Sequence, residues 1–165
     1  MPTQQQPSKQ EAFERIAMPQ LAALLRVARR LTPEPALAED LVQETMLLAW
    51  RGFHRFQAGT NARAWLFRIL FNAFHGEGRK ALRTPEPQPC DVRPMLQEAA
   101  EIAEALQSLP VEQRTVLLLA VVEGFTCREI AGILDLPIGT VMSRLSRARQ
   151  ELRRFLAPMA KEAYR

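Results

Sequence analysis

Apolar residues recur along this chain at intervals of three and four, which is the spacing of one face of an α-helix. No segment alternates apolar and polar residues cleanly, so the pattern gives no sign of β-strands. We therefore predict an all-α fold. The Thr32–Pro35 segment ends the first predicted helix, and Gly76 and Gly78 end the third. In the first half of the chain the predicted helices cover residues 13–31, 36–50 and 62–75.

The second of these helices has two different sides. We expect the apolar side to be buried; it consists of Leu37, Leu41, Thr45 and Leu48. The other side is acidic or polar and consists of Glu39, Asp40 and Gln43, with Glu44 at the border. The helix therefore offers an acidic face to a partner.

The second half of the chain predicts a helix-turn-helix. Two helices come first: one begins near residue 96 and halts at Leu109–Pro110, and the next has Pro110 in its first turn and runs to residue 122. Thr126 and Glu129 then have the spacing of a capping box, in which each side chain bonds a free backbone amide near the other residue. A proline follows this short helix, and a longer helix runs over residues 139–156. A short helix, a tight turn and a longer helix form the helix-turn-helix pattern.

Alternating prolines separate the two halves of the chain. Over residues 84–94 they remove helix donors and disfavour helical backbone conformations, so this segment reads as a linker. We predict two small helical domains joined by this Pro-rich linker. The predicted bounds are 11–82 for the first domain, 83–95 for the linker and 96–160 for the second domain.

The last predicted helix has an apolar and a basic side. Arginine can bond guanine through two atoms and glutamine can bond adenine, so the basic side has the chemistry of a major-groove reader. A basic stripe alone is more often a solvated surface, but its place after a capped helix and a tight turn favours DNA binding. The apolar side consists of Val141, Leu145, Ala148, Leu152 and Phe155. The basic side consists of Ser143, Arg147, Gln150 and Arg154, with Ser146 and Arg153 beside them.

Composition adds bounds on partners and location. The formal net charge is +4 and the sequence pI is about 9.7, a mild basic excess that favours a polyanionic partner. Cys90 and Cys127 are too few and too far apart for a disulfide framework or a zinc site, which fits a reducing cytoplasm. The first ten residues lack the apolar stretch of a signal peptide, and no apolar run is long enough to cross a bilayer. We expect a cytoplasmic protein without membrane insertion.

The second half also carries the motifs of a known family. They are Glu123–Thr126, Glu129–Ala131, Ile133–Pro137, Gly139–Val141, Ser143–Leu145 and Arg147–Arg149. Together they resemble the C-terminal domain of the extracytoplasmic-function (ECF) sigma factors of the sigma-70 family. Asp135 stands where the family usually has glycine, and aspartate tolerates the left-handed conformation better than most residues. Cys127 stands where an aromatic or other residue is common. The resemblance implies binding to the minus-thirty-five promoter element through Met142, Ser143, Ser146, Arg147 and Arg149.

In the first half, the segment Ala38–Thr45 resembles the helix with which this family binds the clamp helices of the largest subunit of core RNA polymerase. The periodicity alone fits an ordinary amphipathic helix equally well. The order of segments favours the resemblance, because an aromatic segment and the run Gly59–Arg68 follow as they do in that family. The resemblance implies polymerase contacts at Asp40, Gln43 and Glu44.

In this family the following loop and helix recognise and open the minus-ten element, with one base flipped into a pocket on the loop. The resemblance places that loop at residues 57–61. Single-stranded bases need stacking surfaces and basic groups. Phe67, Phe71 and Phe74 supply aromatic rings, although most aromatic residues on such a helix belong to the core, where we expect Trp65. The candidate minus-ten contacts are Gln57, Thr60, Asn61, Arg63, Arg68, Arg79 and Lys80.

Three classes of function compete. A sigma factor would have core RNA polymerase, promoter DNA and an anti-sigma factor as partners, and would need no cofactor and no metal. A conventional dimeric helix-turn-helix regulator would explain only the second half of the chain. An enzyme would depend on His54, His75 and the two cysteines, which show no ligand or nucleophile spacing. We therefore predict a sigma factor and not an enzyme.

Overall fold

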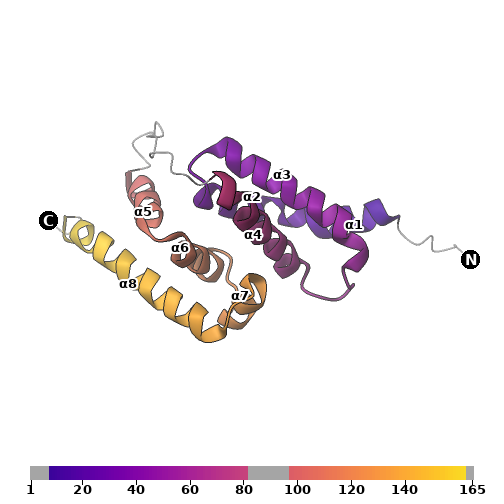
Figure 1. Ribbon diagram of the computed structural model, residues 1–165. Coiled ribbons are helices and arrows are strands. Elements are labelled where there is room, and N and C mark those ends of the chain that lie inside the picture. Colours follow the sequence, from indigo (N-terminus) through magenta and orange to yellow (C-terminus); the bar gives the residue numbers. More distant parts are fainter. Residues whose placement is uncertain (1–7, 82–96, 163–165) are drawn as a thin grey trace, which may run out of the picture.

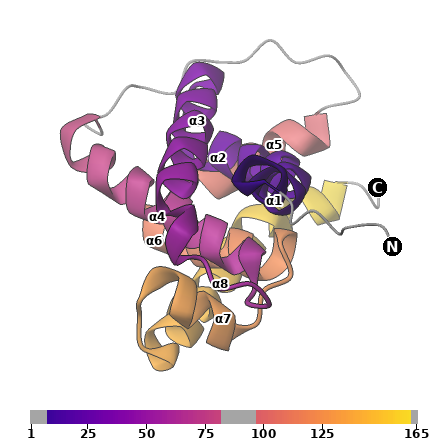
Figure 2. The same cartoon turned by 90° about the vertical axis from the view of Figure 1, so that its right-hand side faces the viewer.

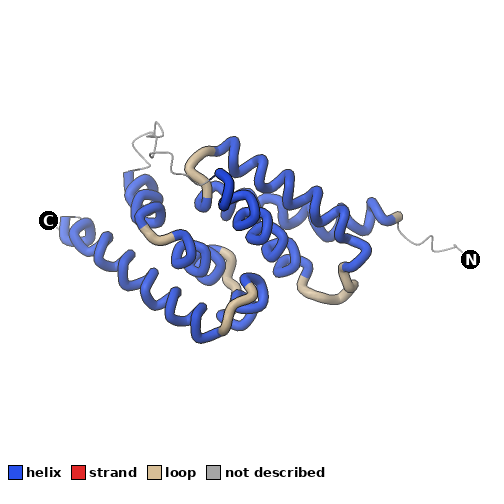
Figure 3. The backbone as a smooth tube through the Cα atoms, viewed as in Figure 1, coloured by secondary structure: helices blue, strands red, loops and turns tan. Residues whose placement is uncertain are grey.

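The computed structural model describes residues 8–81 and 97–162, with the side chains of residues 8–76 and 101–157. Every regular element in these ranges is helical, as Figure 3 shows, which confirms the predicted all-α fold. The helices are α1 (Lys9–Ala17), α2 (Leu21–Leu31), α3 (Pro35–Gly52), α4 (Ala62–Ala81), α5 (Gln97–Ser108), α6 (Val111–Leu117), α7 (Cys127–Leu134) and α8 (Ile138–Glu162). Short turns follow three of them: the 3-10 turns η1 (Met18–Gln20) and η2 (Phe53–Arg55) and the π-helical turn η4 (Leu118–Val122).

Helices α1–α4 form an N-terminal domain and α5–α8 form a C-terminal domain, and the two lie side by side (Figure 1). The predicted linker at residues 84–94 and the side chains of Arg79 and Lys80 lie outside the described residues. In the part of the chain that the structure describes, no helix is both long and apolar enough to cross a membrane.

The single helix predicted over residues 13–31 is in fact two helices. Helix α1 starts earlier, because Ser8 and Glu11 form a capping box: the Ser8 amide donates to Glu11 Oε2 over 2.8 Å, and the Glu11 amide donates to Ser8 Oγ over 3.2 Å. Pro19 then lies in the turn η1, where its missing amide hydrogen and its ring interrupt the helical hydrogen bonds. The periodicity alone did not reveal this break.

The end predicted for the third helix is also wrong. Helix α4 continues through Gly76 and Gly78 to Ala81. Among the described glycines, only Gly59 and Gly124 have a positive φ, so Gly76 and Gly78 do not form the left-handed C-cap on which the prediction depended. Glycine permits a helix end but does not impose one.

The local geometry predicted for the helix-turn-helix is confirmed. Thr126 and Glu129 form a capping box at the start of α7, with the Thr126 amide donating to Glu129 Oε2 over 2.8 Å. Asp135 caps the end of α7 in the left-handed conformation, with φ 54° and ψ 49°. Helix α8 follows after Pro137 and buries Val141, Leu145 and Ala148 in the core, whereas Phe155, predicted on the apolar side, remains 37% exposed.

The buried cores of the two domains are continuous. Helix α4 packs on α3 of its own domain and on α7 of the C-terminal domain, so α4 lies between α3 and α7 (Figure 2). At the boundary the rings of Phe67 and Phe125 meet edge to face, with centroids 5.4 Å apart. Both rings belong to one cluster of buried residues that spans the molecule. In this structure, the continuous core holds the two candidate DNA-binding surfaces at a defined position relative to each other.

Candidate nucleic-acid interface

The basic side of α8 is open to solvent. The capped helix α7 and the left-handed turn at Asp135 place α8 so that its apolar stripe packs inward. Met142 is 57% exposed even though it is apolar, which leaves it free to contact a base or a thymine methyl. Arg149 lies at the edge of this side, because it also lines a groove with Leu117 and Leu152. All the predicted minus-thirty-five residues are exposed: Met142, Ser143, Ser146, Arg147 and Arg149.

The acidic side of α3 differs from the prediction at Leu37. This residue was predicted to be buried, yet it is 40% exposed, and Leu47 is 43% exposed. At about 100° per residue, Leu37 and Leu47 lie on the same stripe of α3 as Asp40 and Glu44. Glu39 instead pairs with Arg29 over 3.5 Å inside the domain. The exposed stripe is thus mixed apolar and acidic, and Gln43 at its border is exposed as well.

The predicted minus-ten loop is a compact turn. Thr60 Oγ1 donates to the carbonyl oxygen of Gln57 over 2.7 Å, and Gly59 takes a positive φ of 89° that allows the chain to reverse. Asn61 is the N-cap of α4, because its Oδ1 accepts from the amide of Ala64 over 3.0 Å. Gln57, Thr60, Asn61 and Arg68 are exposed.

The aromatic residues near the loop support it rather than face solvent. Phe56 packs on Trp65 with ring centroids 4.8 Å apart, and Trp65 is partly buried, in agreement with the packing role predicted for it. Phe67, Phe71 and Phe74 are all buried in the core. Their rings are therefore not available to stack on bases in this structure, so the stacking role considered for them in the sequence analysis is not supported.

Arg63 and Asn61 meet the C-terminal domain. Arg63 is half-buried and pairs with Glu123, a buried carboxylate that also pairs with Arg26. Asn61 Nδ2 donates to Glu129 Oε1 over 3.4 Å. The pKa of Glu129 lies below its usual range, chiefly because it accepts hydrogen bonds from the backbone and then the side chain of Thr126, so it stays ionised here. No pattern in the sequence indicated that Glu123 would take part in this contact.

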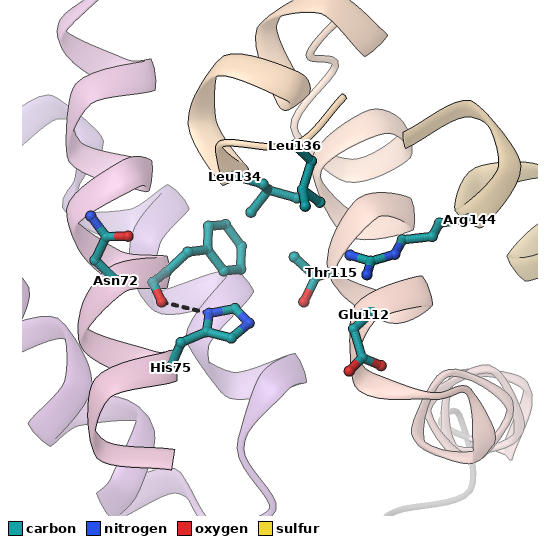
Figure 4. Close-up of a pocket in the computed structure, with 8 residues that line it drawn as sticks. Asn72, His75, Glu112, Thr115, Leu134, Leu136 and Arg144 are labelled. Carbon is teal, nitrogen blue, oxygen red and sulfur yellow. Dashed lines mark hydrogen bonds between the residues drawn. The ribbon is translucent and has the colours of Figure 1, made fainter. Parts of the chain in front are cut away.

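Elsewhere the contact between the domains is less tightly packed. A cavity of about 390 Å³ lies between α4, with Phe71, Asn72 and His75, and the C-terminal domain, with Thr115 and Arg144 (Figure 4). Thr115 Oγ1 is buried and has no hydrogen-bond partner among the described residues.

The groups considered for an enzyme make structural contacts. His54 Nδ1 lies 2.9 Å from the carbonyl oxygen of Arg51, and His75 Nδ1 lies 2.7 Å from that of Phe71, so each histidine bonds to its own segment. Cys127 is a partly buried residue in the first turn of α7. Within the described ranges no group of three or more His, Cys, Asp or Glu side chains is placed to hold a metal ion.

The geometry therefore defines a class: an all-helical protein that presents DNA-reading chemistry on a helix-turn-helix and a second polar and basic surface on a separate helical domain. Two family models match the chain, sigma-70 region 2 over residues 19–84 and sigma-70 region 4 over residues 99–152. The ECF RNA polymerase sigma factor EcfG of Rhodopseudomonas palustris is 39% identical over 124 residues, covering 70% of this chain and 68% of that protein. The ECF sigma factor SigM of Mycobacterium tuberculosis is 33% identical, covering 88% and 77%.

Solved structures agree with these matches. The sigma factor RpoE of Bartonella quintana, in complex with the anti-sigma factor NepR, superposes with a TM-score of 0.78 at 32% identity, covering 88% of this chain and 97% of that one. The structure of CnrH with the cytosolic domain of CnrY gives a TM-score of 0.72 at 30% identity, covering 90% of both chains. The chain belongs to the ECF sigma factors of the sigma-70 family, which direct RNA polymerase to promoters and catalyse no reaction of their own.

Proposed function

We propose that this sigma factor reads the minus-thirty-five element with α8, reads and opens the minus-ten element with the loop at residues 57–61 and helix α4, and binds core RNA polymerase with α3. The observation that carries the proposal is the exposed side of α8, where the side chains of Met142, Ser146 and Arg147 are open to solvent. Helix α7, which precedes α8, begins with a capping box and ends with a left-handed residue. This is the placement that a recognition helix needs to enter the major groove.

The exposed stripe on α3 supports the role in polymerase binding. Leu37 and Leu47 offer apolar area, and Asp40 and Glu44 offer charge that can choose a basic partner. Binding sites between proteins combine apolar contact with a polar surround in this way.

The minus-ten surface combines polar loop residues with arginines. Gln57, Thr60 and Asn61 supply groups that can bond the edge of a base, and Arg68 supplies an exposed charge for the backbone. Arg63, Arg79 and Lys80 complete the proposed set, because their positive charges suit the backbone of a single strand. The domain bounds that we propose remain 11–82 and 96–160, with a linker at 83–95.

Two further features follow from the relatives. The similar chain RpoE was solved in complex with the anti-sigma factor NepR, and CnrH was solved in complex with the cytosolic domain of CnrY. We therefore propose that an anti-sigma factor controls this chain as well. Because its partner would be core RNA polymerase, we propose that the protein acts in the cytoplasm.

Run-off transcription with core RNA polymerase and a genomic promoter library tests the proposal. The chain should produce transcripts from a defined subset of promoters that share two upstream elements. Binding to duplex DNA as a dimer, without any transcript from core polymerase, would instead support the conventional regulator and overturn the proposed roles.

A further inference from the structure

The negative charge of Glu123 is paired by arginines of the other domain. Its side chain has no exposed area, and among the described side chains both of its partners, Arg26 of α2 and Arg63 of α4, belong to the other domain. Arg26 binds it with two nitrogens, Nε to Oε1 over 3.0 Å and Nη2 to Oε2 over 3.1 Å. A buried carboxylate without such partners is strongly disfavoured. Its burial is therefore stable only while the two domains remain together.

Arg63 joins this ion pair to the aromatic contact between the domains. Its guanidinium carbon lies 4.8 Å from the ring centroid of Phe125, a favourable arrangement of a cation over an aromatic face. Asn61 is held beside it by Glu129. Two candidate minus-ten residues, Asn61 and Arg63, are thus occupied by the C-terminal domain.

The closed arrangement also conflicts with the length of a promoter. The two elements lie about 25 base pairs apart, or about 85 Å at about 3.4 Å per base pair. A compact chain of 165 residues has a radius of gyration of about 15 Å and is therefore about 40 Å across. The domains must separate before both elements can be bound, and the cavity between α4 and Thr115 indicates a contact that is not packed throughout.

We propose that Arg26, Arg63 and Glu123 form an interdomain clasp that holds the protein in a closed state and withholds Asn61 and Arg63 from DNA. This inference rests on the proposed role of those two residues in minus-ten binding. A ligand that binds only the open state has its apparent affinity reduced by the fraction of open molecules. The clasp thereby lowers binding to DNA by the free sigma factor.

Glu123→Gln and Arg26→Gln test the clasp in the full chain. Neither residue is a candidate DNA contact. Arg29→Gln is the matched control for Arg26→Gln, because Arg29 lies on the same helix but pairs with Glu39 inside its own domain. Glu151→Gln is the control for Glu123→Gln, because Glu151 pairs with Arg154 within α8. Circular dichroism checks that all four variants stay helical.

Two measurements report on the variants. Small-angle X-ray scattering gives the radius of gyration, and we expect the two clasp variants to exceed the compact value of about 15 Å by several ångströms while the controls match the parent. Fluorescence anisotropy with a labelled single strand of about 20 nucleotides of mixed sequence gives DNA affinity. We expect affinity to rise about tenfold if the open fraction rises tenfold.

Arg26→Gln is the decisive variant, because it removes a positive charge. Electrostatics alone would weaken its binding to DNA, so a gain in affinity supports release of the minus-ten surface. An unchanged radius in both clasp variants, or an equal increase in the controls, overturns the clasp. A larger radius without a gain in affinity overturns its inhibitory role. Failure of the proposed function would appear separately, as absence of run-off transcripts from the parent.

Discussion

Both polar atoms of the Asn61 side chain are occupied in the closed structure. Its Oδ1 caps α4 through the Ala64 amide, and its Nδ2 reaches Glu129. Substitution by alanine would therefore combine two effects, the loss of the N-cap and the loss of the side-chain amide. Loss of an N-cap costs about 1 kcal/mol of stability by itself. Serine at this position keeps a capping oxygen and removes the amide that would contact a base.

We expect Asn61→Ser and Gln57→Ala to open promoters less than the parent while duplex binding through α8 persists. A lost pocket contact of about 1 kcal/mol shifts the open fraction several-fold, since extruding a base costs only a few kcal/mol. Permanganate footprinting of polymerase–promoter complexes measures the unstacked thymines. Asn61→Ala should add a loss of thermal stability that Asn61→Ser lacks. Full opening by both polar-loop variants would remove the loop from minus-ten recognition.

Arg147→Ala should weaken binding to a cognate minus-thirty-five duplex by about 1–3 kcal/mol if Arg147 contacts a base through two nitrogens. The variant would then lose discrimination at one base pair, whereas a phosphate contact would lower affinity for all sequences alike. Gel-shift titrations over several salt concentrations separate these cases. Arg29→Ala carries the same charge change away from α8 and is the control. Equal affinity of Arg147→Ala and the parent at every salt concentration would show that Arg147 does not touch DNA.

Glu129 gives the start of α7 a dependence on pH. Hydrogen bonds from Thr126 hold the pKa of this carboxyl below its value in the unfolded chain. Its contribution to stability is therefore complete above the unfolded pKa and is lost as pH falls through the folded pKa. Glutamine also completes a capping box but does not titrate in this range. Urea unfolding from neutral pH to about pH 3 should show a smaller loss for Glu129→Gln than for the parent; parallel curves would contradict this.

At the scale of elements, α3 carries the proposed polymerase surface. We expect Asp40→Arg combined with Glu44→Arg to reduce binding to core RNA polymerase without loss of helicity, because Asp40 is exposed, Glu44 is only partly buried, and charges open to solvent contribute little to folding. A pull-down with core polymerase measures the effect. Glu14→Arg combined with Glu104→Arg changes the net charge equally at exposed sites on other helices and serves as the control. Unchanged binding by the α3 variant would remove this helix from the interface.

At the scale of the whole molecule, the continuous core predicts that the two domains unfold together. Phe67 and Phe125 join the cores, and the clasp adds an ion pair at the same boundary. Differential scanning calorimetry of the parent should give one transition with equal calorimetric and van't Hoff enthalpies. Glu123→Gln should reduce this coupling and broaden or split the transition. Two separate transitions in the parent would show that the domains are energetically independent.

The fold class and the helix-turn-helix could be predicted from local sequence patterns. Helical periodicity, the Thr126 capping box and the tolerance of Asp135 for left-handed backbone are local properties, set by residues a few positions apart. The solvent-facing side of α8 also followed from periodicity, because Val141 and Ala148 could be recognised as core residues without their partners.

Which faces of the other helices are covered depends on how the helices pack against one another. Leu37 stays exposed because no element of residues 8–81 or 97–162 covers that side of α3. Phe67, Phe71 and Phe74 are buried because α4 packs between the two domains. Glu123 gains its arginine partners from positions 97 and 60 residues away. Contacts at such separations depend on how whole helices pack, and the periodicity of any one helix contains no information about its neighbours.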